Sequence, residues 1–280
     1  MPRDGNRRSA ILVGGLTVIT LALPTPASGT GGNNRCSGGL FPDLQTVVPK
    51  HLSVQNQQQR EILRFSNGIA NRGAGDWRLR PDPPLGTATF TNAVQEILDQ
   101  PAGEGNIVCE EITSTFAFHE EHNHWHVGDV ALFEVRHADD TGFGGDMGGV
   151  VTNDRGESQS IKTTFCLIDW YKLDDNARTS ERVYWDCATS YQGIQPGWVD
   201  QYHQSTVGQQ IDITGLAVGT YYLQSTANPD GVFMESDLTN NSAWTSFSLT
   251  RDSKGNTKIT EISNSPCDTP GMCGAQSVNR

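Results

Sequence analysis

Residues 118–126 read FHEEHNHWH and contain four of the seven histidines of this 280-residue chain. Three of them, His122, His124 and His126, recur at every second position. Residues two apart on a β-strand point to the same face, whereas a helix would place the three on different sides. The segment VALFEV at 130–135 is apolar and partly β-branched, which also favours a strand. We therefore expect one strand that presents three imidazoles in a row.

These three histidines form a candidate metal site. Three neutral imidazoles that leave one coordination position open are typical of catalytic metal centres, and imidazole suits copper as well as zinc. The alternative is a solvated cluster of histidines on a loop. His119 precedes the three at an odd spacing, so it is expected to point elsewhere. It either contacts the ligand histidines and helps to orient them or, as we favour, is simply a surface histidine.

Strand-like segments also dominate the second half of the chain. They are rich in β-branched and aromatic residues, and they lie at 162–167, 182–187, 210–214, 219–227 and 244–250. The sequence has no long helical periodicity, although residues 92–98 fit either a short helix or an edge strand. We predict a mainly β fold, a single antiparallel β-sandwich-like domain with long loops and few short helices.

The N-terminus has the features of an export signal. Arg3, Arg7 and Arg8 precede an apolar run at 10–23, and small residues suitable for cleavage follow. The run is too short for an ordinary membrane span, so an uncleaved anchor is the less favoured alternative. We predict a signal peptide at 1–29, a linker at 30–40, a folded domain at 41–251 and a C-terminal tail at 252–280. No stable membrane insertion is expected after cleavage.

Charge and cysteine content narrow the class of protein. With 20 basic and 32 acidic residues, the net charge is −12, which argues against nucleic-acid binding because phosphates need a basic surface. Six cysteines, all beyond the signal peptide, indicate disulfides in an exported chain, and the residues alone leave their pairing open. The Cys-x-x-Cys spacing of thiolate zinc sites does not occur. The protein is therefore predicted to be secreted or extracytoplasmic.

Four separated segments, in matching order and at similar spacing, resemble the catalytic domain of the lysyl oxidase family. They are the histidine segment, KTTFCLID at 162–169, QGIQPGWVDQY at 192–202 with the QIDIT and GTYYL that follow it, and NP at 228–229 followed by ESDLTNN at 235–241. One such motif would be weak, but four in order are specific. The resemblance covers most of the predicted domain at 41–251, which would then be a lysyl-oxidase-like catalytic domain.

This resemblance implies a copper-dependent amine oxidase. Such an enzyme oxidises primary amines, here lysyl side chains or small amines, to aldehydes with O₂ and releases ammonia and hydrogen peroxide. His122, His124 and His126 would bind the copper. The cofactor would be lysine tyrosylquinone (LTQ), which forms when Lys162 attacks the oxidised ring of Tyr202.

One departure from the family concerns the catalytic base. The animal enzymes carry a further histidine shortly after the copper motif, proposed as a general base, and the matching residue here is Phe133. Asp200 and His203 flank Tyr202 and are the local candidates, and only Asp200 is shared with the family pattern. A structural role for Asp200, such as a turn hydrogen bond, is the open alternative.

The resemblance also implies a structural calcium site and a disulfide. The calcium ligands would be Asp43, the Leu44 carbonyl, Glu235, Asp237, Asn240 and Asn241, because hard cations need six to eight oxygens. An Asx-type turn without metal is the alternative, and the sequence from Asn240 to Ser242 also fits a glycosylation acceptor. Cys166 and Cys187 lie where the family has cysteines, but their family partners are missing here. We therefore expect Cys166–Cys187 as the simplest pairing, and we guess Cys36–Cys109 and Cys267–Cys273 for the other four cysteines.

The sequence leaves three hypotheses for the function of this chain. The leading hypothesis is a secreted copper amine oxidase that acts on a primary amine and O₂. The second is a secreted copper- or calcium-binding protein with the same fold and no cofactor. The third is a zinc hydrolase with Glu120 or Glu121 as its base, which leaves Lys162 and Tyr202 unexplained.

Overall fold

The computed structural model describes residues 36–84, 86, 88–138, 147–152, 157–174, 181–187 and 190–274. The predicted signal peptide and most of the predicted linker lie outside these ranges. Within them the strands are β1 (Leu44–Thr46), β2 (Lys50–Gln57), β3 (Arg60–Asn71), β4 (Trp77–Asp82), β5 (Phe90–Leu98), β6 (Ile107–His119), β7 (His124–Ala138), β8 (Met147–Val150), β9 (Ser160–Phe165), β10 (Tyr171–Lys172), β11 (Gln192–Ile194), β12 (Trp198–Tyr202), β13 (Gln210–Asp212), β14 (Gly219–Ala227), β15 (Ser242–Arg251) and β16 (Thr257–Asn264).

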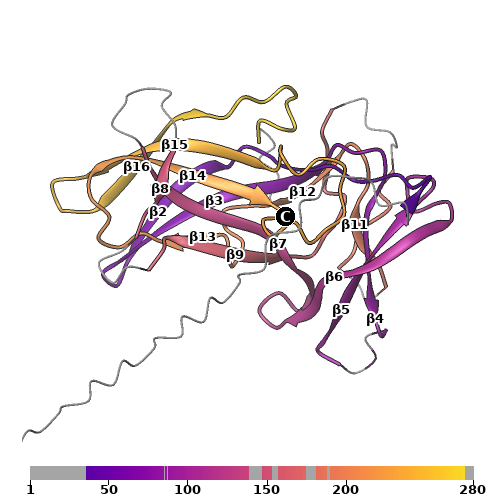
Figure 1. Ribbon diagram of the computed structural model, residues 1–280. Helices are drawn as coiled ribbons and strands as arrows, with labels where there is room; N and C mark the ends of the chain where they lie inside the picture. The colour runs from indigo at the N-terminus through magenta and orange to yellow at the C-terminus, as the bar shows by residue number, and fades with distance from the viewer. Residues whose placement is uncertain are drawn as a thin grey trace, which may run out of the picture. The chain divides into compact units, whose positions relative to one another are not determined.

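The described strands form two antiparallel sheets (Figure 1). The smaller has the order β1-β3-β12-β10, with β2 and β13 also paired to β3. The larger has the order β11-β4-β5-β6-β7-β14-β15-β16, with β8 and β9 paired to β7. The predicted mainly β class is confirmed, and the few short helices expected from the sequence do not occur in the described ranges. Residues 92–98 lie in β5, which is flanked by β4 and β6 and is therefore an interior strand.

Aromatic rings from both sheets make the core. Phe65 of β3 meets Phe133 of β7 edge to face, with 4.7 Å between ring centroids, and both side chains are fully buried. Burying one such side chain stabilises the fold by roughly 1.5–3 kcal/mol. Most strand predictions of the second half are confirmed to within a few residues, as β9, β13, β14 and β15. The packed rings hold β7 and β9, which carry the site, against the smaller sheet.

The histidine segment is a hairpin, so the prediction of one continuous strand was wrong. β6 ends at His119, residues 120–123 form a turn, and β7 begins at His124. The Asn123 N–H donates to the His119 carbonyl (2.8 Å), and Asn123 has a φ of 55°. Asparagine tolerates this left-handed conformation better than most residues, which lets the chain turn within an alternating sequence.

Residues 182–187 were also predicted as a strand, and the structure gives them an irregular path. The backbone N–H groups of Val183 and Tyr184 both donate to Oδ2 of the buried Asp169, each at 2.9 Å. A side-chain carboxylate thus takes the donors that a strand ladder would use. The segment is held beside the site without joining a sheet.

Three disulfides confirm the expected pairings Cys36–Cys109, Cys166–Cys187 and Cys267–Cys273. Part of the predicted C-terminal tail forms β16, which pairs with β15. All described residues belong to one compact unit. Among them, no helix has the length and apolar character needed to cross a bilayer.

Candidate functional site

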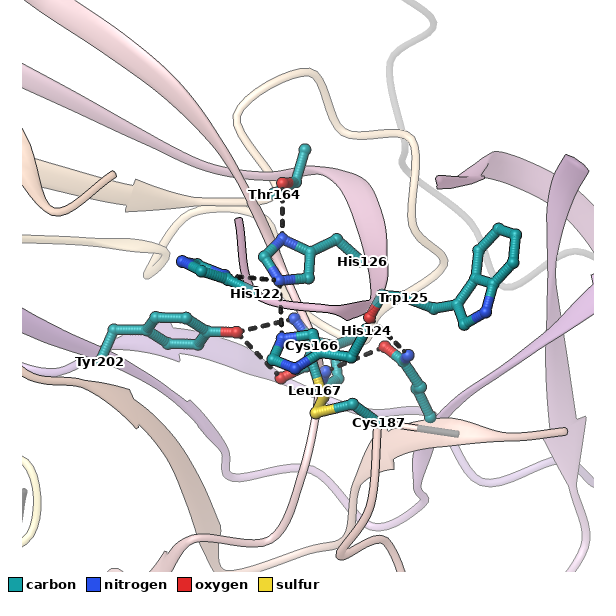
Figure 2. The surroundings of a disulfide bond; sticks show 10 residues. His122, His124, Trp125, His126, Thr164, Cys166, Leu167, Cys187 and Tyr202 are labelled. Atoms are coloured by element: carbon teal, nitrogen blue, oxygen red, sulfur yellow. Dashed lines mark hydrogen bonds between the residues drawn. A yellow bond between two sulfur atoms is a disulfide. The ribbon is translucent and has the colours of Figure 1, made fainter. Parts of the chain in front are cut away.

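The hairpin between β6 and β7 brings His122, His124 and His126 together (Figure 2). His122 reaches the cluster from the turn, whereas His124 and His126 project from the first residues of β7. One nitrogen from each ring lies within 4.8 Å of the other two. The predicted grouping of the three imidazoles is therefore present, although a turn and not strand alternation alone produces it.

The nitrogen positions fit a single metal ion. His126 Nε2 lies 2.9 Å from His124 Nε2 and 3.1 Å from His122 Nδ1. Two nitrogens that are each about 2 Å from a common ion are about 3 Å apart when they subtend roughly a right angle. Three donors of the same soft-to-borderline type therefore converge at distances suited to copper or zinc.

Thr164 orients the most buried of the three rings. His126 is 2% exposed, and its Nδ1 lies 2.9 Å from Oγ1 of Thr164 on β9. When Nδ1 carries the proton and donates it to this hydroxyl, the lone pair remains on Nε2, which faces the other two imidazoles. Thr164 is a candidate site residue that the sequence analysis did not single out, although it lies inside the KTTFCLID segment.

His119 packs directly on the cluster, so the preference for a surface histidine was wrong. Its ring stacks on His126 with 4.7 Å between centroids and lies 4.5 Å from the His122 ring. Its Nδ1 is buried and has no hydrogen-bond partner within the described ranges. The turn at 120–123 causes this placement, because it folds the end of β6 back over β7.

Tyr202 at the end of β12 is 3% exposed and lies beside the histidines. Its ring stacks on Phe165 of β9, with a centroid distance of 4.3 Å and an interplanar angle of 13°. Its hydroxyl oxygen accepts the Cys166 N–H (2.8 Å), as Figure 2 shows. The centroids of Tyr202 and His126 are 6.5 Å apart, with the rings nearly perpendicular.

Lys162 lies on β9, two positions before Thr164, and its backbone pairs with Leu132 of β7. The strand that orients His126 and stacks on Tyr202 is therefore the one that carries this lysine. Its side chain falls outside the described part of the structure.

The candidate bases have different surroundings. Asp200 is fully buried on β12, and its negative charge adds to burial in raising the pKa of Tyr171. His203 lies beside His51, with 5.8 Å between ring centroids, and burial followed by the His51 charge lowers the pKa of its imidazole. Phe133 is a core residue packed against Phe65.

The predicted calcium residues meet between β1 and the 235–241 loop. Asn240 Nδ2 donates to Asp43 Oδ1 (3.0 Å) and contacts Asp237 Oδ2 (3.4 Å). Glu235 Oε2 accepts the Leu44 N–H (2.8 Å), so Leu44 contributes its N–H here, whereas its carbonyl was the expected ligand.

Two oxygens in this loop are available to a cation. Oδ1 of Asn240 and Oδ1 of Asn241 are buried and have no hydrogen-bond partner in the described part of the chain. Burial raises the pKa of the half-buried Glu235 carboxyl to about 7, although hydrogen bonds from Asn228 and Asn241 oppose the shift. A cation would satisfy the two oxygens and favour the carboxylate, so these residues fit the ion.

Fold and site together define an antiparallel β protein with a cluster of three histidines, a candidate metal site, beside a buried tyrosine. The lysyl oxidase family model matches residues 90–258, which is more than half of the 280-residue chain. The chain therefore belongs to the lysyl oxidase family.

Several curated proteins are similar to it. Lysyl oxidase homolog 3 of Homo sapiens is 29% identical over 184 residues, covering 65% of this chain and 18% of that protein. Lysyl oxidase homolog 1 of Homo sapiens is 31% identical over 129 residues, covering 45% and 19%. Lysyl oxidase homolog 2 of Xenopus tropicalis is 27% identical over 183 residues, covering 65% and 18%. The chain thus spans less than a fifth of the length of these relatives.

Proposed function

We propose that this chain is a secreted, copper-dependent amine oxidase that converts primary amines, either lysyl side chains or small amines, to aldehydes. Ammonia and hydrogen peroxide are the other products, and O₂ is the oxidant. The observation that carries the proposal is the convergence of three imidazoles beside the buried phenol of Tyr202, in a chain of the lysyl oxidase family.

Copper would be held by His122, His124 and His126. When bound, it supplies one-electron exchange with O₂, which zinc cannot do. Thr164 supports this role by holding the His126 ring with Nε2 toward the other ligands. His119 supports it by covering the His122 and His126 rings, which restricts their rotation.

Lys162 and Tyr202 are proposed to form LTQ, which supplies an electrophilic carbonyl that ordinary side chains lack. Phe165 fixes the plane of the Tyr202 ring by stacking on it, and burial keeps water from the ring. The Cys166 N–H stabilises negative charge on the phenol oxygen. Lys162 must be neutral to attack, because an ammonium has no lone pair. It lies near the start of β9, which pairs with β7, the strand that carries His124 and His126.

Asp200 is proposed as the base, since it is buried two residues from Tyr202 on the same strand. The alternative is a structural role through its electrostatic contact with Tyr171. An Asp200→Asn variant that retains copper and cofactor but loses turnover would support the catalytic role.

A structural calcium ion is proposed at Asp43, Leu44, Glu235, Asp237, Asn240 and Asn241. The unsatisfied oxygens of Asn240 and Asn241 support it. The ion would join β1 to the loop that precedes β15. The catalytic domain is proposed to extend over 41–251. An extracytoplasmic location is supported by the three disulfides, and the net charge of −12 speaks against a nucleic-acid partner.

One observation favours a second candidate function. The Tyr202 hydroxyl is engaged by the Cys166 backbone and its ring is stacked on Phe165, as in an ordinary core tyrosine. These contacts would be sufficient in a secreted copper- or calcium-binding protein that has this fold but no quinone cofactor.

One experiment separates the two functions. The full chain is loaded with copper in air, and its visible absorbance, its phenylhydrazine adduct and its release of hydrogen peroxide from a primary amine are measured. The oxidase should be coloured and reactive, and Tyr202→Phe should be neither while still binding copper. A wild-type protein that binds copper stoichiometrically yet stays colourless and unreactive would establish the binding protein and reject the oxidase.

A further inference from the structure

The Cys166–Cys187 disulfide lies against the histidine cluster (Figure 2). A ring nitrogen of His124 and the two sulfur atoms all lie within 4.8 Å of one another. His124 therefore belongs to two groups of potential metal ligands. It shares one with His122 and His126, and the other with Cys166 and Cys187.

The second group becomes a ligand set only when the disulfide is reduced. Two thiolates and one imidazole are soft donors, which favour Cu(I) or zinc, whereas three imidazoles also suit Cu(II). Metal–sulfur bonds are about 2.3 Å and metal–imidazole bonds about 2.0 Å, so one ion spans donors up to roughly 4.3 Å apart. The observed group is at most slightly wider than that limit, so a small movement brings the donors into reach.

We propose that His124, Cys166 and Cys187 form a second metal site, one that opens on reduction and binds a single Cu(I). A dithiol reductant supplies the two electrons and two protons, the S–S bond breaks, and the dithiol becomes a cyclic disulfide. Cu(I) then displaces one proton from each cysteine thiol and takes the His124 nitrogen as its third ligand. The copper stays Cu(I) throughout. The proposal does not depend on oxidase activity, although it shares His124 with the proposed copper site.

The local structure decides which cysteine moves. Cys166 is fully buried directly after β9, and its N–H is held by the Tyr202 oxygen. Cys187 is half-buried and lies in an irregular part of the chain outside the strands. When the two sulfurs bind one ion, they must separate to roughly 4 Å. The Cα atoms of the two cysteines are now 5.5 Å apart, so this separation is possible if the backbone at Cys187 moves.

His124 can serve only one ion at a time. In the reduced chain His124 would bind the Cu(I) that Cys166 and Cys187 hold. His122 and His126 alone would then bind a second copper ion only weakly. In the oxidised chain the sulfurs are bonded to each other, so His124 is available to the other two imidazoles. When O₂ takes two electrons and two protons from the two thiols and becomes hydrogen peroxide, the disulfide closes, and copper binding would therefore transfer to the site beside Tyr202.

The test uses the full chain under anaerobic conditions. A phosphine reductant, which takes up an oxygen from water as it reduces disulfides, opens all three bonds without adding competing thiols. Cu(I) is then added at one equivalent. X-ray absorption should show sulfur neighbours at about 2.3 Å in the reduced chain and only nitrogen or oxygen neighbours for Cu(II) in the oxidised chain. Alkylation mapped by peptide mass spectrometry should show that Cu(I) protects Cys166 and Cys187.

The other cysteines are internal controls in the same sample. Protection confined to Cys267 and Cys273 or to Cys36 and Cys109, or a Cu(I) shell without sulfur, would overturn the proposal. This measurement needs no cysteine variant.

Two histidine variants distinguish this proposal from the oxidase. His124→Ala should reduce the sulfur-bound Cu(I) of the reduced chain and also abolish Cu(II) binding by the oxidised chain. His122→Ala should abolish only the Cu(II) binding. If both variants retain cysteine protection equal to the wild type, His124 is not a ligand and the site as proposed is wrong, whatever the oxidase assays show.

Discussion

Thr164 offers a single hydroxyl that sets the orientation of a proposed ligand. Its Oγ1 lies 2.9 Å from His126 Nδ1, and removing such a partner weakens metal affinity by roughly 10–100-fold. We expect Thr164→Val to lower copper affinity by about this factor in a competition titration, with the fold retained. Thr163→Val, on the adjacent position of β9, is the matched control and should bind copper as the wild type does. Equal affinities in the two variants would contradict the role given to Thr164.

Lys162 and Tyr202 carry the sharpest prediction at the same scale. Lys162 and Tyr202 are 40 positions apart in the sequence (202 − 162), so only the fold can bring them together. We expect Lys162→Arg and Tyr202→Phe to keep copper and lose the cofactor, because arginine is not a usable nucleophile and phenylalanine lacks the phenol. Peptide mapping of the copper-loaded wild type should find the two peptides cross-linked.

The control for this pair is Tyr222→Phe, a buried tyrosine on β14 that packs against Trp244. It should form the cross-link normally. Separate, unmodified Lys162 and Tyr202 peptides in a preparation that still oxidises amines would refute the assignment.

At the scale of elements, the 235–241 loop is joined to β1 through Asn240 and Asp43. A ligand that binds only the folded state stabilises it by about 3 kcal/mol at roughly a hundredfold excess over its Kd. Added calcium should therefore raise the Tm of the wild type. We expect Asp237→Ala to lower the Tm in calcium and to remove the dependence on calcium, whereas Glu104→Ala, on an exposed turn, should retain it. An unchanged calcium response in Asp237→Ala would reject the site.

Glu235 in the same loop predicts a pH dependence. Burial raises the pKa of its carboxyl from 4.5 to about 7. The folded chain then binds this proton more tightly than the unfolded chain does, so the stabilisation is full below about pH 4.5 and is lost as the pH rises through 7. We expect the Tm of the calcium-free protein to fall across this interval, and Glu235→Gln to flatten the fall. Calcium should oppose the loss, since it favours the carboxylate.

Thermal unfolding in a chelator at a series of pH values measures this effect. Glu104→Gln is the control and should keep the wild-type slope. A Tm that rises over the same interval in the wild type, but not in Glu235→Gln, would reverse the sign and contradict the proposed protonation.

At the scale of the whole molecule, the disulfides close loops of different length. Cys36–Cys109 spans 73 residues and Cys267–Cys273 spans 6. Loop-closure entropy gives about 4 kcal/mol for the longer and about 2 kcal/mol for the shorter. We expect replacing Cys36 and Cys109 with serine to lower the free energy of unfolding by the larger amount, measured in urea. Copper binding should be unchanged in this double variant and in the one that replaces Cys267 and Cys273 with serine, because neither disulfide belongs to the histidine cluster.

The sequence alone predicted the mainly β class, the three histidines as a group and, with the family resemblance, the Cys166–Cys187 disulfide. These depend on local signals: β-branched and aromatic runs, a two-residue repeat and short motifs. The same local signals predicted one continuous strand and missed the turn within the histidine segment. Alternation there is compatible with both a strand and a hairpin, and a preference of Asn123 for positive φ decided between them.

Only the tertiary structure showed what surrounds the histidines. His126 meets Thr164 across 38 residues, Tyr202 meets Cys166 across 36, and the disulfide that reaches His124 spans 21. Asp169 likewise accepts the N–H groups of residues 183 and 184, which therefore do not form the strand that their composition predicted. Such contacts arise when strands distant in the chain pair and pack. Sequence patterns missed these contacts for a physical reason. The free energy of each contact depends on a residue far away in the chain, and the propensities of a short segment carry no information about that residue.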